Sequence, residues 1–180
     1  MRRLRVAQIV SLNGWAIPFL FGGRRVSGLL SYPNGLVEEV AYSNNTSVNY
    51  VYDAALRLTS IDDRDISEST IMKLSYEYTA DGLIARITET DNSGVVGWVK
   101  FAYDARGRLI KEVRTGEHPY HIAYEYDPGG NRTRKVQSLP GCDRIETVYH
   151  YDVEDPDTYG SFNNRLMYYE TFETCRVFER

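Results

Sequence analysis

The sequence has few of the residues that bind metals or carry redox and acid-base chemistry. Its 180 residues include two cysteines, Cys142 and Cys175, and three histidines, His118, His121 and His150. The cysteines lack the CxxC spacing of a zinc site, and the histidines complete no ligand set with them, so we expect no metal and no other cofactor. Free buried thiols are the interpretation that we favour for the cysteines, and a single disulfide in an oxidising compartment is the alternative.

Charge of one sign and long apolar runs are also lacking. The formal net charge is −4, and lysine and arginine are scattered among the acids, so no basic field would attract a nucleic acid. The stretch from Val6 to Phe21 follows an arginine-rich start, but Gln8, Asn13 and Pro18 interrupt it. It is too broken for a membrane-spanning helix. We favour an irregular first part of the repeat array, or a start inside a longer gene, over a cleavable signal peptide.

Tyrosine is abundant in this chain, whereas long runs of helix formers are scarce. There are 15 tyrosines against 6 phenylalanines and 2 tryptophans. Tyrosine favours pleated, half-buried surfaces. A hydrophobic content of 42% with 26% charged residues is typical of a globular chain, and the length suits one folded unit.

An aromatic-x-Tyr triplet recurs along the chain. It occurs at Tyr50-Val51-Tyr52, Tyr76-Glu77-Tyr78, Phe101-Ala102-Tyr103, Tyr124-Glu125-Tyr126 and Tyr149-His150-Tyr151. The second tyrosines, which we call the repeat tyrosines, lie 26, 25, 23 and 25 residues apart (78−52, 103−78, 126−103, 151−126). Aromatics two positions apart point to one face of a strand, so we predict that these ten residues pack on one side of a sheet.

A tight turn is predicted after most of the triplets. Aspartate comes directly after four of the five repeat tyrosines, at Asp53, Asp104, Asp127 and Asp152, and Thr79 is the exception. Glycine stands four residues after three of them, at Gly82, Gly107 and Gly130, and Leu56 takes this place in the first unit. Aspartate can accept hydrogen bonds from amides two residues on, and glycine allows a positive φ without steric cost. We therefore assign these aspartates and glycines to turns.

The pattern predicts an all-β, antiparallel repeat array of β-hairpins that forms a curved, elongated sheet. Leu58, Ile84 and Leu109 stand six residues after their repeat tyrosines, where we expect them to lie across from the aromatics; Arg132 takes this place in the fourth unit. We place the array at residues 30–172, after an N-terminal segment at 1–29 and before a C-terminal tail at 173–180. Residues 152–164 are expected to form an enlarged turn.

Two segments closely resemble the YD-repeat signature of Rhs proteins. They are Tyr103-Asp104-Ala105-Arg106-Gly107-Arg108-Leu109 and Tyr126-Asp127-Pro128-Gly129-Gly130-Asn131-Arg132. Rhs proteins, the shell-forming components of bacterial insecticidal toxin complexes and animal teneurins look similar in their use of this repeat. The resemblance implies a β-sheet that spirals into a hollow shell, which in bacteria can enclose a toxin. It identifies the chain as a fragment of such a shell.

The resemblance and the repeats together favour a non-catalytic structural protein, part of an Rhs-like shell or cell-surface scaffold that encloses or contacts a partner. The expected partner is a protein, either further Rhs repeats, a toxin cargo or a second copy of the chain. The alternative is a surface module that binds carbohydrate or protein through exposed tyrosines. We expect a secreted or cell-surface protein that is cytoplasmic before export.

Three features that could suggest chemistry have simpler explanations. Asp62, Asp63 and Asp65 lack the alternating ligands of a calcium loop and are predicted to lie in a solvated loop. An aspartate that recurs once per repeat, even near His150, is explained by a structural role performed once per repeat. The segment 127–130 resembles the Asp-Pro-x-Gly motif of self-cleaving Rhs cores, but it stands at a repeat's turn and is predicted to be one. No nucleophile elbow is present, so no catalytic residue is assigned.

Overall fold

The computed structural model describes residues 26–151 and 166–175. They form one sheet of twelve antiparallel strands, and each strand pairs with its neighbours in the sequence. The strands are β1 Val26–Ser31, β2 Val37–Tyr42, β3 Ser47–Tyr52, β4 Leu58–Arg64, β5 Thr70–Tyr78, β6 Ile84–Asp91, β7 Gly94–Tyr103, β8 Leu109–Arg114, β9 Tyr120–Tyr126, β10 Arg132–Leu139, β11 Cys142–Tyr151 and β12 Leu166–Cys175.

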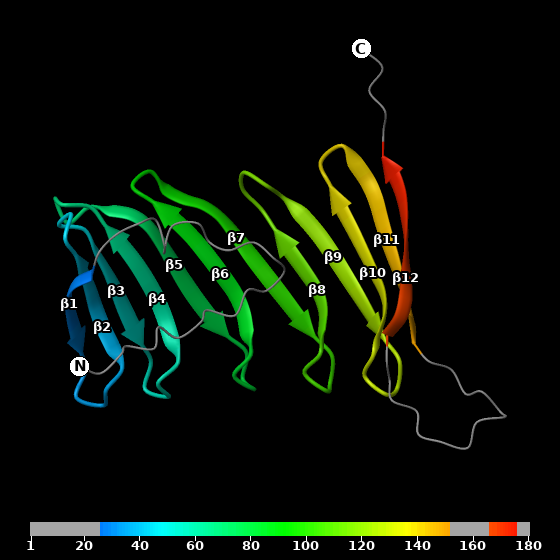
Figure 1. The fold of residues 1–180 in the computed structure, drawn as a ribbon, viewed down its shortest axis with the longest axis horizontal. Helices are drawn as coiled ribbons and strands as arrows, with labels where there is room; N and C mark the ends of the chain where they lie inside the picture. The colour runs from blue at the N-terminus through cyan, green and yellow to red at the C-terminus, as the bar shows by residue number, and fades with distance from the viewer. Residues whose placement is uncertain (1–25, 152–165, 176–180) are drawn as a thin grey trace, which may run out of the picture.

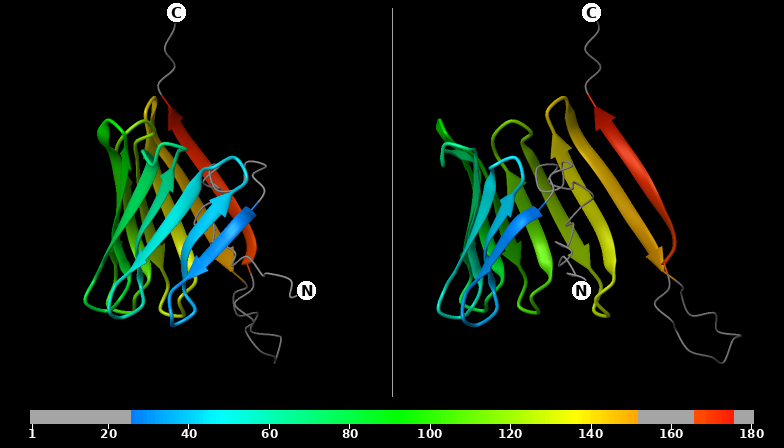
Figure 2. Two further views of the ribbon diagram at one scale, coloured as in Figure 1. Left: turned by 90° about the vertical axis from the view of Figure 1, so that its left-hand side faces the viewer. Right: turned by 60° about the vertical axis from the view of Figure 1, so that its left-hand side comes forward.

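The prediction of an all-β hairpin array is confirmed. The described residues form a single layer that curves along its length, and they contain no helix (Figure 2). The first and last strands, β1 and β12, lie at opposite ends of the sheet and leave it open (Figure 1). A sheet with no second layer has to bury its apolar side chains against cross-strand neighbours.

One cluster of the core lies on one face of the sheet, across strands β3 to β6, and buried Val99, Ile122 and Tyr124 lie further along, on β7 and β9. Val48, Ile61 and Leu74 are buried and form a cluster, with partly buried Tyr50 and Tyr76 packed against it. The register places Tyr50 opposite Ile61 and Ile61 opposite Leu74, so these three side chains form a row across the strands. The first aromatics of the first two triplets therefore lie on the packed face.

The register shifts by one residue beside each repeat tyrosine. Tyr52 lies opposite Leu58, Tyr78 opposite Ile84, Tyr103 opposite Leu109 and Tyr126 opposite Arg132. The cross-strand position predicted for the residue six after the tyrosine is thereby confirmed. A register shift of this kind is a β-bulge, which increases the local twist and bends the strand.

Some predicted features differ from the structure or lie outside the described residues. Strand β1 begins four residues before the predicted start of the array, and β12 continues three residues past its predicted end. Asp152, the enlarged turn and residues 1–25 lie outside the described part of the chain. The backbones of Cys142 and Cys175 are paired in the β11–β12 register, but their side chains are not described, so both alternatives for their chemistry stand.

Two isoleucines test the location of the core. Ile61 is 6% exposed within the β3–β6 cluster, whereas Ile66, in the turn after β4, is 72% exposed. Ile61→Ala should lower the free energy of unfolding by about 2–4 kcal/mol through lost burial and a residual cavity. Ile66→Ala should lower it by less than about 0.5 kcal/mol. Urea denaturation measures both changes, and equal losses would contradict this placement of the core.

Candidate functional site: the tyrosine–aspartate turns

The tyrosine–aspartate turns share one edge of the sheet. They join β3 to β4, β5 to β6, β7 to β8 and β9 to β10, along the lower margin of the sheet in Figure 1. The β1–β2 turn lies at the same edge, and the turns at the opposite edge join β2 to β3, β4 to β5, β6 to β7, β8 to β9 and β10 to β11. Any role that repeats once per unit therefore has its residues aligned along one margin of the molecule.

Four of the repeat tyrosines make the same hydrogen bond to the preceding unit. In each case the phenolic hydroxyl donates to the backbone carbonyl of the residue six after the previous repeat tyrosine. The bonds run from Tyr78 to Leu58 at 2.6 Å, from Tyr103 to Ile84 at 2.9 Å, from Tyr126 to Leu109 at 2.8 Å and from Tyr151 to Arg132 at 3.0 Å. We call this the tyrosine–carbonyl bond. It links successive hairpins, because donor and acceptor always belong to neighbouring units.

Sequence reasoning missed the tyrosine–carbonyl bond, although its signal was present. The acceptor was already assigned as the residue across the hairpin from the previous tyrosine. The strand after each turn also pairs with the strand that carries the next repeat tyrosine, as β4 pairs with β5. The carbonyl of the acceptor therefore lies next to that tyrosine. The regular spacing of the tyrosines, combined with that topology, would have predicted the bond.

The aspartate of the turn organises the backbone of its own hairpin. Asp104 Oδ1 accepts from the backbone N–H groups of Arg106 at 2.9 Å and Arg108 at 3.0 Å, and Oδ2 accepts from Arg108 Nε at 2.6 Å. Asp53 accepts in the same way from Ala55 and Arg57. The backbone amide of the arginine, assisted by its guanidinium, holds the pKa of each aspartate below its usual value. The carboxylates stay ionised and serve as turn acceptors.

The arginine of the turn reaches the next unit. The Arg108 guanidinium lies over the Tyr126 ring at 4.8 Å, and its Nη1 donates to the carbonyl of Asp127 at 2.9 Å. The Arg57 guanidinium lies over the Tyr78 ring at 4.5 Å. The aspartate thus fixes an arginine that covers the following repeat tyrosine, and a cation over an aromatic face is attractive.

The second unit lacks both the aspartate and the arginine. Thr79 replaces the aspartate, and Leu83 stands where the arginine is found in the neighbouring units. Thr79 Oγ1 still accepts from the backbone N–H of Leu83 at 3.1 Å, which keeps one turn bond. In the fourth unit Asn131 replaces arginine and donates its side-chain amide to Asp127 at 2.9 Å. In these four units, the fifth residue after the repeat tyrosine is a polar donor only where an aspartate can accept its hydrogen bond.

The fourth residue after each of the first four repeat tyrosines has a left-handed backbone. The φ angle is 83° at Gly82, 76° at Gly107 and 96° at Gly130, and Leu56 adopts 62° in the first unit. The Asp127–Asn131 segment forms the same hydrogen-bonded turn as the other units, which confirms that 127–130 is a turn. Leucine adopts a positive φ only at a cost, because its Cβ approaches the following carbonyl oxygen.

The first aromatics of the triplets are more deeply packed than the repeat tyrosines. Burial raises the pKa of Tyr50 and of Tyr76 to about 12 each, with neighbouring phenols adding to the effect. Tyr124 is buried, and the other first aromatics are partly buried. The described triplets therefore present no exposed aromatic row. The contribution of the triplet aromatics to stability stays a prediction.

The predicted solvated loop at Asp62, Asp63 and Asp65 is wrong for two of the three residues. Asp62 and Asp63 lie on β4 and are 6% and 5% exposed. Asp62 Oδ2 accepts from Arg64 Nε at 3.0 Å and Nη2 at 2.9 Å, and Oδ1 accepts from Thr70 at 3.0 Å. A buried carboxylate is stable where it is paired in this way. Only Asp65 lies in the turn, where it accepts from backbone amides.

A third buried acid was missed by sequence reasoning. Glu112 on β8 is buried and accepts a short hydrogen bond from the Tyr120 hydroxyl on β9. Burial, followed by this bond and the carboxylate charge, raises the pKa of Tyr120. Burial also lowers the pKa of Lys135 on β10, whereas the negative charge of Glu112 raises it. Neither the repeat nor the triplet marks these residues, so nothing in the pattern could have found them.

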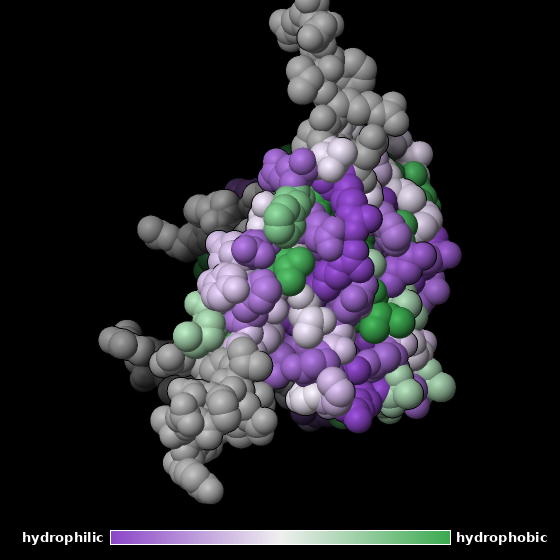
Figure 3. Space-filling view, turned by 90° about the vertical axis from the view of Figure 1, so that its right-hand side faces the viewer, coloured by the Kyte–Doolittle hydropathy of each residue, from purple (hydrophilic) through white to green (hydrophobic). Residues whose placement is uncertain are grey.

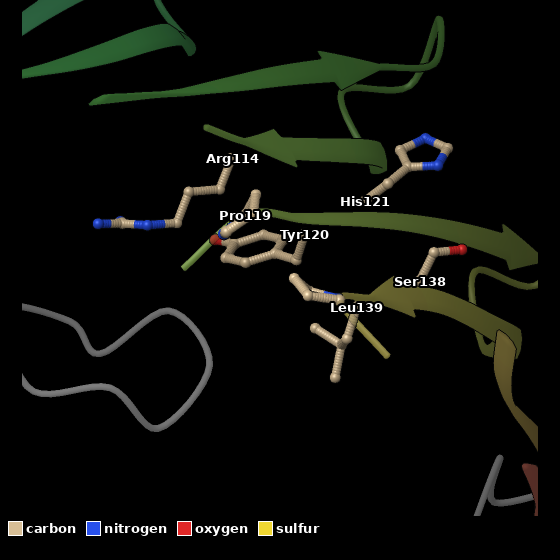
Figure 4. Close-up of a pocket in the computed structure, with 7 residues that line it drawn as sticks. Arg114, Pro119, Tyr120, His121, Ser138 and Leu139 are labelled. Carbon is tan, nitrogen blue, oxygen red and sulfur yellow. The ribbon is translucent and has the colours of Figure 1, made fainter. Parts of the chain in front are cut away.

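A depression of about 330 Å³ lies at the tyrosine–aspartate turns, where Thr79, Phe101 and Asp104 are among the residues that line it. Another of about 240 Å³ lies between Arg114, Pro119, Tyr120, Leu139 and Pro140 at the edge opposite the tyrosine–aspartate turns (Figure 4). His121 and Ser138 border it but lie on the other side of their strands from Tyr120 (Figure 4), as alternation along a strand requires. The polar groups at this second depression therefore do not converge on one point.

Neither a metal cluster nor a membrane-spanning helix is found within residues 26–151 and 166–175. No group of three or more histidine, cysteine, aspartate or glutamate side chains there could hold a metal ion. No helix in these ranges is long and apolar enough to cross a membrane. The structure thus offers the row of turns, rather than a cleft, as the feature to be explained.

Comparisons with known proteins bear on the fold. No family model and no curated protein matches the sequence. The chain is similar to part of the Photorhabdus luminescens Tc holotoxin pore (20% identity, TM-score 0.64, 71% of this chain and 7% of that one). It is also similar to parts of TcdB2-TccC3-Cdc42 (21%, 0.66, 79% and 8%) and TcdB2-TccC3 (21%, 0.63, 71% and 8%).

These similarities support the Rhs-type assignment at the level of the fold. The chain spans less than a tenth of the length of the solved proteins that it matches. At identities near 20% the likeness concerns the arrangement of the strands. The activities and binding partners of those complexes are properties of those proteins.

Phenylalanine substitution isolates the tyrosine–carbonyl bond. Tyr103→Phe removes the bond to the Ile84 carbonyl and keeps the ring, so it should lower the free energy of unfolding by about 0.5–1.5 kcal/mol. Tyr168→Phe on β12 is the control, because the Tyr168 hydroxyl is exposed and makes no hydrogen bond to a described residue. Urea denaturation compares the two variants. A control that loses as much stability as Tyr103→Phe would show that the bond contributes nothing.

A pair of opposite substitutions tests the positive-φ position. Leu56→Gly should raise the free energy of unfolding by about 1 kcal/mol, because Leu56 is 58% exposed and strained at φ 62°. Gly107→Leu should lower it by about 1 kcal/mol or more for the same reason. Thermal and urea denaturation measure both. A loss of stability in Leu56→Gly would contradict the assigned strain.

Proposed function

We propose that this chain is a non-catalytic structural repeat segment, a stretch of the wall of an Rhs-like shell or surface scaffold that encloses or contacts a partner protein. The single observation that carries the proposal is the tyrosine–carbonyl bond, which recurs four times between successive units. A contact made once per unit, between units, performs a structural role once per unit. Its consequence is a sheet that can be extended without changing its internal contacts.

The partners of the aspartates support a structural rather than a catalytic role. A general base needs a free lone pair directed at a substrate. Both oxygens of Asp53 and of Asp104 accept from the backbone and the arginine of their own turn. Their lowered pKa values disfavour the protonated form that a general acid needs. The buried acids Asp62 and Glu112 are likewise engaged by neighbouring side chains.

The solved structures support a protein as the partner. They are a holotoxin pore and assemblies of TcdB2 with TccC3, one of which includes Cdc42. For this chain we propose further repeats, an enclosed cargo or a second copy, in a secreted or surface-displayed protein. The array at residues 30–172 between shorter end segments is part of the same proposal.

A second candidate function is a surface module that binds carbohydrate or protein through exposed aromatics. It is favoured by Tyr168, Tyr169 and Phe172 on β12, which are all more than half exposed. The described repeat tyrosines do not support it. They are partly buried, and the hydroxyls of four of them donate to backbone carbonyls. An aromatic ligand surface would therefore be confined to the last strand.

Deletion of one whole repeat tests the structural role. Removing residues 79–103 joins Tyr78 to Asp104, which restores a tyrosine–aspartate turn between β5 and β8 and keeps the bond from Tyr78 to Leu58. Each unit contacts only the units next to it, so the shortened chain should stay β-rich and unfold cooperatively. Circular dichroism and thermal melting measure both properties.

The matched control removes half a repeat. Deletion of residues 79–91 takes away one turn and β6, so every later tyrosine–aspartate turn would fall on the wrong edge of the sheet. This variant should lose cooperative unfolding or melt far below the whole-repeat deletion. If the two deletions behave alike, the chain does not act as an array of interchangeable units and the proposed function fails.

A further inference from the structure

The third unit places two arginine side chains against the turn of the fourth unit. Arg108 lies over the Tyr126 ring and donates to the carbonyl of Asp127 at 2.9 Å. Arg106 donates to the carbonyl of Pro128 at 2.7 Å. The turn of the fourth unit thus offers an aromatic ring and two adjacent carbonyl oxygens to guanidinium groups.

The second unit has neither of these arginines. Asp81 and Leu83 stand three and five residues after Tyr78, at the positions that Arg106 and Arg108 hold after their own repeat tyrosine. Two positive charges are thereby exchanged for one negative charge. The second unit therefore cannot act on the turn of the third unit as the third acts on the fourth.

The turn of the third unit nevertheless has the groups that hold a guanidinium in the fourth. Tyr103 corresponds to Tyr126, and the carbonyls of Asp104 and Ala105 correspond to the two that accept from arginine. Among the described residues, no cation lies over the Tyr103 ring and no side chain donates to either carbonyl. The Asp104 carbonyl accepts the turn bond from the Gly107 N–H, which leaves one of its two lone pairs for a further donor.

A depression of about 330 Å³ lies at this place, and we call it the second-unit pocket. Asp81 and Leu83 line it from the second turn, and Tyr103 and Asp104 line it from the third. The Asp81 side chain is exposed and makes no hydrogen bond or ion pair with a described residue. The pocket therefore joins a carboxylate, an aromatic ring and a carbonyl oxygen.

The leucine of the second unit extends to the same point as an arginine but ends without a donor. Leu83 Cδ1 lies 3.6 Å from the position that a Cβ would have at Gly107. One unit earlier, Arg57 Nη1 lies 3.9 Å from the equivalent position at Gly82, and its guanidinium covers the Tyr78 ring. The groups that surround such a guanidinium are thus kept in the second-unit pocket without the guanidinium itself.

The chemistry of the pocket selects a guanidinium over other ligands. A guanidinium is planar, so it can lie flat on a phenol ring while its edges donate to oxygen atoms. An ammonium group is a point charge and cannot combine these contacts in one plane. An anion would be repelled by Asp81 and would meet carbonyl oxygens, which only accept hydrogen bonds.

The exposed aromatic residues of β12 provide no comparable argument. Tyr168, Tyr169 and Phe172 are more than half exposed, but no other unit shows what would bind at their positions. Figure 3, which faces this end of the molecule, shows hydrophobic residues scattered among hydrophilic ones. Scattered exposed hydrophobic residues are common on protein surfaces and identify no ligand.

We propose that the second-unit pocket binds an arginine side chain of a partner protein. The guanidinium stacks on the Tyr103 ring and pairs with the Asp81 carboxylate, and it donates to the Asp104 carbonyl. This inference rests on the proposed function and names the chemistry by which the partner is recognised. The source is a protein rather than free arginine, because the residues that line the pocket include no cation to bind the carboxylate of an amino acid.

An acetylated and amidated Gly-Gly-Arg-Gly-Gly peptide is the probe, titrated into the full chain labelled with nitrogen-15. We expect saturable changes in the amide signals of residues 79–83 and 103–107, with a dissociation constant on the order of millimolar. The matched control replaces arginine by citrulline, which has the same shape without the charge, and should bind about fivefold more weakly or worse. Equal affinities, changes concentrated elsewhere, or no saturation would overturn the inference.

Asp81→Asn tests the carboxylate. This variant should bind the arginine peptide about two- to fivefold more weakly, because it loses an exposed ion pair. Glu117→Gln is the control: it removes the same charge from an exposed residue in the turn between β8 and β9, at the opposite edge of the sheet. Its affinity should equal that of the parent chain. Equal weakening in both variants would show an effect of net charge alone and would overturn the site.

Thr79→Asp combined with Leu83→Arg tests whether the pocket is the place of the repeat arginine. The double variant supplies the aspartate and the guanidinium that the neighbouring units have, so it should melt at a higher temperature and no longer bind the peptide. Peptide binding that persists in this variant would place the ligand elsewhere and overturn the inference.

Free L-arginine tests the source of the guanidinium. If it binds about tenfold more tightly than the peptide, the ligand is a small molecule and the inference of a protein partner is overturned. The whole-repeat deletion tests the proposed function separately. A deletion variant that stays folded and unfolds cooperatively, together with a full chain that fails to bind the peptide, would refute the arginine site alone.

Discussion

The structure depends on how one hairpin is held to the next. The single curved sheet has no opposing layer among residues 26–151 and 166–175, so lateral contacts there replace the face-to-face packing that stabilises most β proteins. The tyrosine–carbonyl bond is such a contact, because it joins a side chain of one unit to the backbone of the one before. The acceptor lies beside a β-bulge in each unit. The ring adds buried surface, and its hydroxyl satisfies a carbonyl of the preceding unit.

The aspartate and arginine of the turn are best understood as support for that tyrosine. Asp104 holds Arg108 by two kinds of bond, to its amide and to its guanidinium, and Arg108 then covers the Tyr126 ring. The second unit shows that these parts are interdependent. With Thr79 in place of aspartate, an arginine at the position of Leu83 would have no carboxylate to fix it, and an apolar side chain is found there instead. The signature thus describes a connection between units as much as a turn.

The sequence predicted the elements that follow from local periodicity. The triplet identified the strands that enter each turn, and the six-residue offset gave the partner across the hairpin, because both lie within one local unit. The burial of Asp62 and Glu112 was not predicted. Their partners Thr70 and Tyr120 lie on the strand after the next turn, so recognising them required the register of a second, less regular turn. Local patterns assign faces to residues, whereas burial depends on what the neighbouring strands place beside them.

The first and last described strands differ from strands that are protected at an open sheet edge. Natural sheets protect free edges with lysine, proline, inward-pointing charges or short strands, because an exposed row of backbone groups recruits other chains. Strand β12 has ten residues with no lysine, arginine or proline, and exposes Tyr169 and Phe172. Strand β1 has six residues and no charge at all. Interior strands need no such protection because their neighbours already pair with them. Among the described strands, β1 and β12 therefore lack the positive charges and prolines that commonly protect an open edge.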